Sequence, residues 1–325
     1  MGRSRIGLAV AFAALPARER EAIERTWLAA VETAHAWVPA FAEFGLAALG
    51  SVRRRRADLL VYLGESSRFD RLAGALARDV PVVFVKSTVE GLLDRPPGAA
   101  PRYRMSTGVR GLASALVAAA PAGPSVDWRS LPWPTELAPL LRLDPAERRY
   151  VEASVGAFRQ AAAARGLEWR RGVPRRGPFS LFLTMHDPAA AALASAACAL
   201  WPRCTVLAAD GMTSTCAPGG HSWPPQVVRV RHWTPRSRSR SNRVLRRVWG
   251  DGAPADFDSV GMLFGALRFL DGALGGGAPP DRLEEAAVQP GPLGPMRLTA
   301  TGRPHPERLV LMRGRAAQVV SVRGA

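Results

Sequence analysis

Short, unbroken apolar runs alternate along this chain with longer segments of helical spacing, and this alternation restricts its fold most strongly. The run 59–63 is entirely apolar, as expected for a strand that is buried on both faces of a parallel sheet. Residues 18–37 place Ile23, Trp27 and Val31 on one side, which is typical of a helix that packs against a core. The alternation predicts an α/β protein with mostly parallel sheets.

The same signals recur up to the C-terminus. Further strands are expected at 5–12, 80–85, 167–173, 180–185, 205–209, 227–230 and 319–322, and further helices at 68–78, 107–119, 144–165, 188–200, 242–248 and 257–267. The segment 38–56 has no convincing strand pattern, and only a short connection without a helix separates the strands 167–173 and 180–185.

The length and composition are those of a folded protein with two domains of ordinary size. The chain has 325 residues, of which 47% are hydrophobic, so it can bury real cores and is not a disordered chain. No apolar run reaches the length of a membrane span,, and we expect no membrane insertion. Three cysteines, an odd number without framework spacing, argue against a disulfide scaffold.

The net charge of +17 is carried almost entirely by arginine, because Lys86 is the only lysine. A bias toward GC-rich codons explains such a preference without any nucleic-acid role. The densest runs, 53–56 and 236–240, lack the interleaved aromatic residues that are typical of a nucleic-acid surface,. We interpret them as solvated faces and expect no specific nucleic-acid partner.

Motifs of catalysis and cofactor binding are missing from the sequence. It has no Gly-x-Ser-x-Gly elbow, no P-loop, no Gly-x-Gly-x-x-Gly and no His-Glu-x-x-His,. Cys216, His221 and His232 lack the close pairing that zinc ligands usually show,. We therefore expect a protein that is not an enzyme and that has no cofactor and no metal.

The order of elements in the C-terminal third is similar to that of a known ligand-binding family. The strand 227–230 and the Trp-Thr-Pro turn 233–235 are followed by a helix and by the apolar helix 257–267, then by Gly294-Pro-Met-Arg-Leu298 and His305. This order resembles type I periplasmic binding proteins. Within them it is most similar to the branch of the amide sensor AmiC and the urea-binding proteins of ABC transporters.

Two segments of the first half extend the resemblance. Lys86-Ser-Thr-Val-Glu-Gly91 follows the strand 80–85, at the place where that branch carries Pro-Thr-Pro-Tyr-Glu-Gly. The segment 57–67 is similar to the family strand that ends in a ligand-contacting serine. The chain is identified as a shortened, divergent member, because a family helix and a family strand have no counterpart in the predicted elements.

The resemblance implies two lobes, one formed by 1–104 with 234–295 and the other by 105–233 with 296–325. It also implies a small polar ligand between the lobes, at the carboxyl ends of strands and the starts of helices. The polar residues expected there are Ser66, Ser67, Thr88 and Glu90 in the first lobe and Thr184, His186, Asp210, Thr213 and Ser214 in the second. Helix capping and turn formation are the alternative roles of these side chains.

Three functions are compatible with this resemblance. The first is a cytoplasmic amide sensor that holds an antiterminator-type regulator, and the second is the solute-binding component of an ABC importer for urea, amides or branched-chain amino acids, with a permease as partner. The third is a degenerate scaffold that binds a protein. Residues 5–12 fit a first strand, which favours the cytoplasm, but the basic start before them also fits a secretion signal and thus the periplasm,. The ligand and the oligomeric state stay open.

Overall fold

The computed structural model describes residues 2–12, 15–45, 56–66, 69, 79–95, 97–143, 145–212, 217–235, 237–249 and 258–322. The chain divides into two compact units. Unit 1 consists of residues 1–108 and 232–308, and unit 2 consists of residues 109–231 and 309–325. The last division lies beyond the expected position after residue 295, because residues 289–305 form a small three-stranded sheet within unit 1.

Unit 1 is built on a five-stranded parallel sheet with the order β2-β1-β3-β4-β5. Its strands are β1 (Ser4–Ala11), β2 (Trp37–Phe44), β3 (Leu59–Gly64), β4 (Val82–Phe84) and β5 (Arg102–Arg104). Every residue of β3 is buried, as expected for a strand that is covered on both faces. The predicted first strand is confirmed, and it lies inside the sheet between β2 and β3.

One prediction for this sheet was wrong. The segment 38–56, which shows no convincing strand pattern, contains most of β2, the edge strand beside β1. Pro39 and a shift of register at this point interrupt the alternation of side chains, so the pattern of period two is lost from the sequence. The helix expected at 18–37 is α1 (Ala17–Glu32), which ends earlier than expected, and Trp37 belongs to β2.

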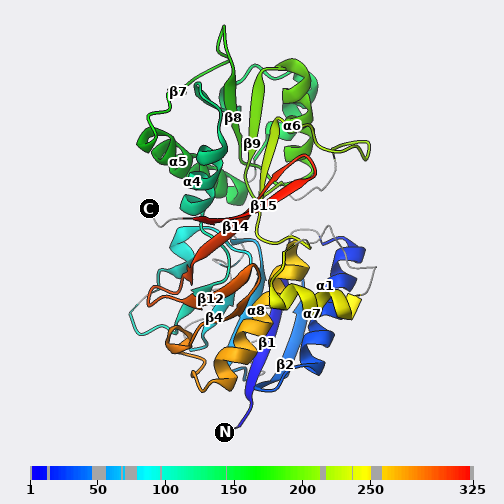
Figure 1. Ribbon diagram of the computed structural model, residues 1–325, viewed down its shortest axis with the longest axis vertical. Helices are drawn as coiled ribbons and strands as arrows, with labels where there is room; N and C mark the ends of the chain where they lie inside the picture. The colour runs from blue at the N-terminus through cyan, green and yellow to red at the C-terminus, as the bar shows by residue number, and fades with distance from the viewer. Residues whose placement is uncertain are drawn as a thin grey trace. The chain divides into compact units, whose positions relative to one another are not determined.

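Helices α1, α7 (Arg240–Trp249) and α8 (Asp258–Gly275) cover one face of the sheet of unit 1 (Figure 1). Fourteen of the eighteen residues of α8 are buried, which explains why this helix is apolar nearly all round. The other face carries an aromatic cluster of Tyr62, Phe69 and Phe84, with ring centroids 4.5–5.8 Å apart. The expected helix 68–78 lies outside the described residues, apart from Phe69.

Unit 1 ends in the small sheet β11-β12-β13. Its strands are β11 (Gln289–Gly291), β12 (Gly294–Leu298) and β13 (Pro304–His305). The motif Gly294–Leu298 that carried part of the resemblance is therefore a strand, and Arg297 pairs with His305 across the antiparallel ladder.

Unit 2 contains a seven-stranded sheet with the order β15-β14-β10-β9-β8-β6-β7. The strands are β6 (Ser125–Asp127), β7 (Trp169–Arg170), β8 (Phe179–Leu183), β9 (Cys204–Ala208), β10 (Val227–Arg231), β14 (Glu307–Arg313) and β15 (Ala316–Val322). From β7 to β10 the neighbouring strands are parallel, and β14 joins β10 antiparallel. The short connection between β7 and β8 contains no helix, as predicted.

In the part of unit 2 that the structure describes, the helices on the sheet are α4 (Val109–Ala119), α5 (Pro145–Ala164) and α6 (Ala189–Leu200). In Figure 1, α4 and α5 lie together on one side of this sheet, whereas α6 lies on the other. The predicted two-lobed α/β fold with mostly parallel sheets is confirmed.

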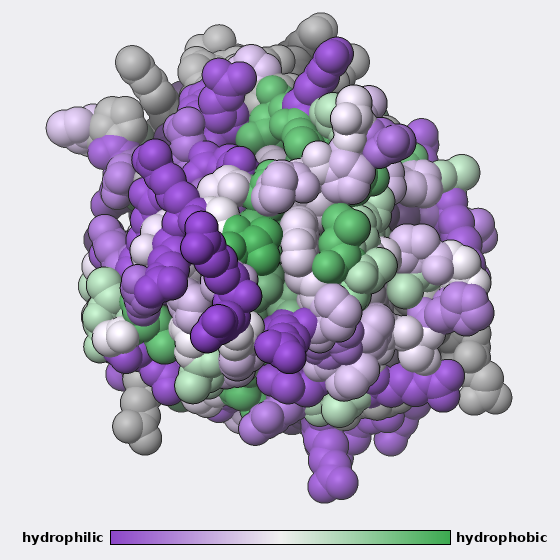
Figure 2. Space-filling view, turned by 90° about the horizontal axis from the view of Figure 1, so that it is seen from above, coloured by the Kyte–Doolittle hydropathy of each residue, from purple (hydrophilic) through white to green (hydrophobic). Residues whose placement is uncertain are grey.

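The surface seen in Figure 2 is predominantly hydrophilic, and its apolar side chains form small separate patches. No helix within the described ranges combines the length and the apolar character that a bilayer span requires.

Candidate functional site

The carboxyl ends of three neighbouring strands in unit 2 bring polar side chains to one edge of its sheet. Strands β6, β8 and β9 are adjacent and parallel, with Asp127 beside Phe182 and Leu183 beside Ala208. The residues that follow these strands therefore lie at the same edge, as in other open α/β sheets that bind ligands there. Thr184 and Asp210 are two of them, so the sheet places two predicted side chains at this edge.

A tyrosine that the sequence analysis did not select links two of the predicted residues. The hydroxyl of Tyr150, on α5, donates a hydrogen bond of 2.5 Å to Oδ1 of Asp210. The ring of Tyr150 stacks on the imidazole of His186, with centroids 4.9 Å apart and planes inclined by 27°. Asp210 is buried, whereas His186 is exposed, so the cluster runs from the interior of unit 2 to its surface.

The hydroxyl of Tyr150 keeps its proton at neutral pH. Burial, together with the adjacent Asp210 carboxylate, raises the pKa of Tyr150 well above its usual value, so Tyr150 stays a hydrogen-bond donor. A carboxylate that accepts a phenol bond in a poorly hydrated place is suited to a cationic group, because the attraction between the charges is weakly screened there. The cluster is therefore chemically suited to hold an ammonium group.

Thr184 is the third predicted residue at this edge, and its hydroxyl has a partner inside the protein. Its Oγ1 accepts a hydrogen bond of 3.4 Å from Nε1 of Trp128, and both residues are almost completely buried. Beside them, Arg129 donates to both carboxylate oxygens of Asp127 at the end of β6. The bond between Trp128 and Thr184 links the end of β6 to the end of β8.

Sequence reasoning missed Tyr150, Trp128 and the pair Asp127–Arg129. Strand β6 has only three residues in a Pro-rich stretch, so no apolar run marked Asp127 as the end of a strand. Tyr150 comes from a helix, and a search for polar residues that follow strands does not consider helices. Asp127 was the one signal available, because an aspartate side chain often accepts a bond from the backbone N–H two residues on, as Asp127 does from Arg129 at 3.0 Å,.

Of the residues predicted in unit 1, Thr88 and Glu90 contact the same arginine, Arg104. Ser66 follows β3 and is half-buried. Thr88 is buried, and its carbonyl oxygen accepts a bond of 3.3 Å from Arg104. Glu90 lies 3.4 Å from Arg104 and 3.1 Å from Arg303. Ser67, Thr213 and Ser214 lie outside the described residues, and the ligand-binding role of all nine residues stays a prediction.

Glu90 belongs to a charge cluster of unit 1 whose centre is Arg104. The side chain of Arg104 is only 1% exposed and also lies 3.8 Å from Glu307. Burial raises the pKa of Glu307, and the Arg104 guanidinium offsets only part of that rise. Glu90 lies within 3.4 Å of two arginines, whereas the nearest ion-pair partner of Glu307 is Arg104 at 3.8 Å.

We expect the stability of the Glu307→Gln variant to increase relative to that of the native protein as the pH rises. An acid whose folded-state pKa is raised stabilises the fold in its protonated form, and this contribution is lost as the pH rises through that pKa. Glutamine resembles the protonated acid and removes the loss. Denaturation followed across a pH series that starts at the ordinary glutamate pKa of about 4.3 and extends to about pH 8 measures the difference.

Glu90→Gln is the matched control for this experiment. It removes the same charge from the same cluster but breaks the two closer ion pairs, so it should destabilise the protein at about pH 8. Equal effects of the two substitutions at the higher pH would contradict the distinction between the two carboxyl groups.

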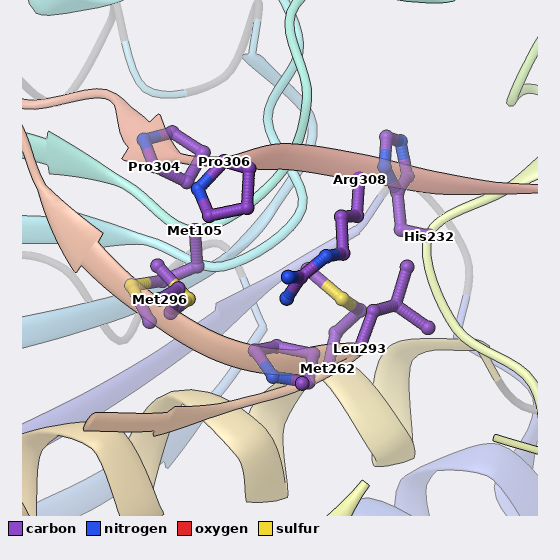
Figure 3. A pocket seen from close by; sticks show the side chains of 10 residues that line it. Met105, His232, Met262, Leu293, Met296, Pro304, Pro306 and Arg308 are labelled. Atoms are coloured by element: carbon purple, nitrogen blue, oxygen red, sulfur yellow. The ribbon is translucent and has the colours of Figure 1, made fainter. Parts of the chain in front are cut away.

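Unit 1 also contains a small cavity lined by Met105, His232, Met262, Leu293, Met296 and Arg308 (Figure 3). In Figure 3 the guanidinium of Arg308 points into this space, and it donates a bond of 2.7 Å to the carbonyl of Pro295. The space available is about 20 Å³, which is enough for about one water molecule. It is too small for an amino acid, so the strand-end cluster of unit 2 remains the better candidate.

The described cysteines are poorly suited to nucleophilic chemistry. Burial raises the pKa of Cys198 to about 11 and that of Cys204 to about 12. Neither thiol is ionised at neutral pH, and the thiolate is the reactive form. Cys216 lies outside the described residues.

Comparison with solved structures shows what the fold is similar to, whereas no family model and no curated protein matches the chain. An ABC-transporter substrate-binding protein from Desulfitobacterium hafniense, in complex with leucine, has a TM-score of 0.67 at 13% identity. The match covers 97% of this chain and 100% of the Desulfitobacterium chain. The leucine-binding protein LivK from Thermotoga maritima has a TM-score of 0.69 at 12% identity, covering 98% of both chains.

A third similar structure binds a ligand of another class. The solute-binding protein of an ABC transporter from R. palustris, in complex with benzoate, has a TM-score of 0.67 at 16% identity. The match covers 99% of this chain and 96% of the R. palustris chain. At these identities the likeness concerns the fold. This chain has the two-lobed α/β fold of type I periplasmic binding proteins, with a polar cluster at the strand ends of unit 2.

Proposed function

We propose that this protein is the solute-binding component of an ABC importer and that its ligand carries an amino group, as an amino acid does. The observation that carries the proposal is the Tyr150–Asp210 pair at the strand ends of unit 2. ABC-transporter binding proteins are among the structures to which this chain is similar along nearly their whole length. Asp210 would accept the ammonium group, and Tyr150 would hold the carboxylate in position. His186, stacked on Tyr150, would lie beside the ligand.

The amide-sensor role is the weaker alternative. It depends on the resemblance to AmiC, whereas two of the similar structures named above belong to ABC transporters. Urea and neutral amides carry no cationic group, so Asp210 would gain no charge interaction from them. The charge of the ligand therefore separates the two functions.

The proposed function also changes the expected location. Among the similar structures is a periplasmic binding protein from Burkholderia mallei, with a TM-score of 0.68 at 12% identity. Because an importer component has to meet its solute before the solute crosses the membrane, we propose that this protein works on the outer side of that membrane. The cytoplasmic location expected from the first strand would then not apply. Fractionation of cells that produce the native gene product tests this.

A thermal-shift screen tests the proposed function directly. The screen contains leucine, isoleucine, benzoate, urea and acetamide at millimolar concentration. A ligand at about 100 times its Kd stabilises a protein by about 2.7 kcal/mol, which raises the Tm of a protein of this size by roughly 4 °C. We expect a shift of this size with an amino acid and none with urea or acetamide.

Two outcomes of this screen would contradict the proposed function. A shift with acetamide or urea and not with an amino acid would favour the amide sensor. No shift with any of the solutes would favour the protein-binding scaffold.

A further inference from the structure

The face of α7 in unit 1 carries positive charge that nothing in the described part of the protein neutralises. Arg238 and Arg240 stand at the start of this helix, and Arg243, Arg246 and Arg247 follow along it. All five side chains are exposed. Within the described ranges, no hydrogen bond or ion pair joins any of them to another group.

This face differs from the other charged helices of the protein. In α1 the exposed arginines alternate with glutamates, and Arg20 pairs with Glu24 at 2.8 Å. Helix α7 contains no acidic residue at all. A solvated helix surface usually mixes both signs because neighbouring like charges destabilise it, so α7 departs from the simple interpretation as a solvated face.

The helix is anchored as a rigid support for these charges. Oγ of Ser239 accepts a bond of 3.1 Å from the backbone N–H of Asn242, which caps the helix,. The side-chain amide of Asn242 donates to the carbonyls of Thr234, Pro235 and Ser237 at 2.7–3.3 Å. The backbone that carries Arg238 and Arg240 is thus fixed, and a partner would meet a preorganised surface.

Positive charge at the start of α7 also works against the helix. The N-terminus of a helix has a positive partial charge, so Arg238 and Arg240 are placed at the unfavourable end. The fold gains nothing from arginine at these positions, whereas an anionic partner would gain from both the side chains and the helix end.

The spacing indicates the shape of the partner. Arg240, Arg243 and Arg247 are three and four residues apart and therefore lie on one side of α7. They extend over about 10 Å along the axis, given a rise of about 1.5 Å per residue. Glutamates at the same spacing on another helix would match them, and arginine forms bidentate bonds with carboxylates.

Two other classes of anion fit this face less well. A nucleic-acid surface needs exposed aromatic side chains for stacking, but the half-buried ring of Trp249 is covered by the guanidinium of Arg25 at 4.3 Å. A membrane-binding helix inserts a broad apolar face, whereas the apolar side of α7 packs inside unit 1 and Val248, 39% exposed, is its one exposed large apolar side chain.

We propose that the arginine face of α7 is a docking surface for an acidic helix of a partner protein. The proposal does not depend on the solute-binding function, since none of its residues belongs to the strand-end cluster. The probe is a synthetic helical peptide with glutamates on one face at the spacing of Arg240, Arg243 and Arg247. Its isomer, with the same composition but with the glutamates distributed around the helix, is the control.

Binding is measured by fluorescence anisotropy at about 150 mM salt, where exposed charges more than about 8 Å apart are screened. We expect the one-faced peptide to bind more tightly than its isomer. The triple variant Arg240→Ala, Arg243→Ala, Arg247→Ala should weaken binding by about tenfold, as expected for the loss of three exposed ion pairs. The matched control replaces Arg171, Arg175 and Arg176 of unit 2, which are also exposed, and should leave binding unchanged.

Two further measurements complete the test. The variant with lysine at positions 240, 243 and 247 keeps the charge, and partial retention of binding would support bidentate recognition by arginine. Parallel titrations use transfer RNA and phosphatidylglycerol vesicles. Equal binding of both peptides, equal loss in the unit 2 control, or tighter α7-dependent binding of RNA or vesicles would each overturn the proposal. Unchanged circular dichroism and an unchanged Tm show that the variants fold.

Discussion

Asp210→Asn should abolish the stabilisation of this protein by an amino acid. The substitution keeps the shape of the side chain and an acceptor for Tyr150, but it removes the charge that would hold the ammonium group. Loss of one partner of a buried, hydrogen-bonded charge pair costs about 2–5 kcal/mol, which corresponds to a Kd at least about 30-fold higher. Isothermal titration calorimetry with the solute that gives the largest thermal shift measures this change.

The control for this experiment is Glu168→Gln, which removes the same charge from an exposed position in unit 2 and should leave the affinity unchanged. A second control changes the ligand. If the best solute is leucine, its analogue without the amino group should bind the native protein weakly and bind Asp210→Asn no worse. Full affinity of Asp210→Asn for the amino acid would show that the ammonium group binds elsewhere.

Tyr150→Phe separates the two members of the pair. It leaves the Asp210 carboxylate in place and removes the donor that is held 2.5 Å from it. Because the charge is retained, the affinity should fall less than in Asp210→Asn. This order of effects follows from the geometry of the cluster and does not require knowledge of the side chain of the ligand.

The elements that the sequence predicts well have long, regular patterns. Strand β3 is an unbroken apolar run and α5 begins at a proline after an aspartate, so their sequence limits agree closely with the structure. A helix that is buried along one stripe has apolar residues at helical spacing, and a strand that is buried on both faces is a continuous apolar run. The order of these segments was sufficient to predict the two-lobed α/β fold.

The elements that were missed have patterns that short length or tertiary contacts obscure. Strand β2 is interrupted at Pro39, and β6 has three residues. Neither strand therefore shows a regular alternation in the sequence. Pairing with a neighbouring strand holds each of them in place. Local propensity is weak evidence where such pairing decides the conformation.

The candidate site was predictable only in part for the same reason. Asp210, Thr184 and His186 follow strands that the sequence marks clearly, and the structure places Asp210 and His186 on the same tyrosine. The tyrosine itself comes from α5, sixty residues before Asp210. No periodicity within one segment encodes a contact between two segments at such a separation.

A second large effect is expected in unit 1, where Gly261→Ala should destabilise the fold. A Cβ at this position on α8 would lie 2.0 Å from two ring atoms of Trp233. The indole is 2% exposed and packed in the core, so it has little room to move. Overpacking of a core typically costs about 1–3 kcal/mol. An approach of 2.0 Å to a buried ring corresponds to the upper end of this range, above the gain of about 1 kcal/mol that alanine brings to a helix interior relative to glycine.

Gly156→Ala on α5 is the matched control, because it is the same substitution inside a helix with no atom within 4 Å of the new Cβ. Only the helix propensity changes there, so this variant should be more stable than the native protein. Urea denaturation followed by circular dichroism measures both variants, and the free energies of unfolding should change in opposite directions. If both variants gained stability, α8 would have to move away from Trp233 at little cost. The packing of this helix on the sheet of unit 1 would then be looser than its buried glycine indicates.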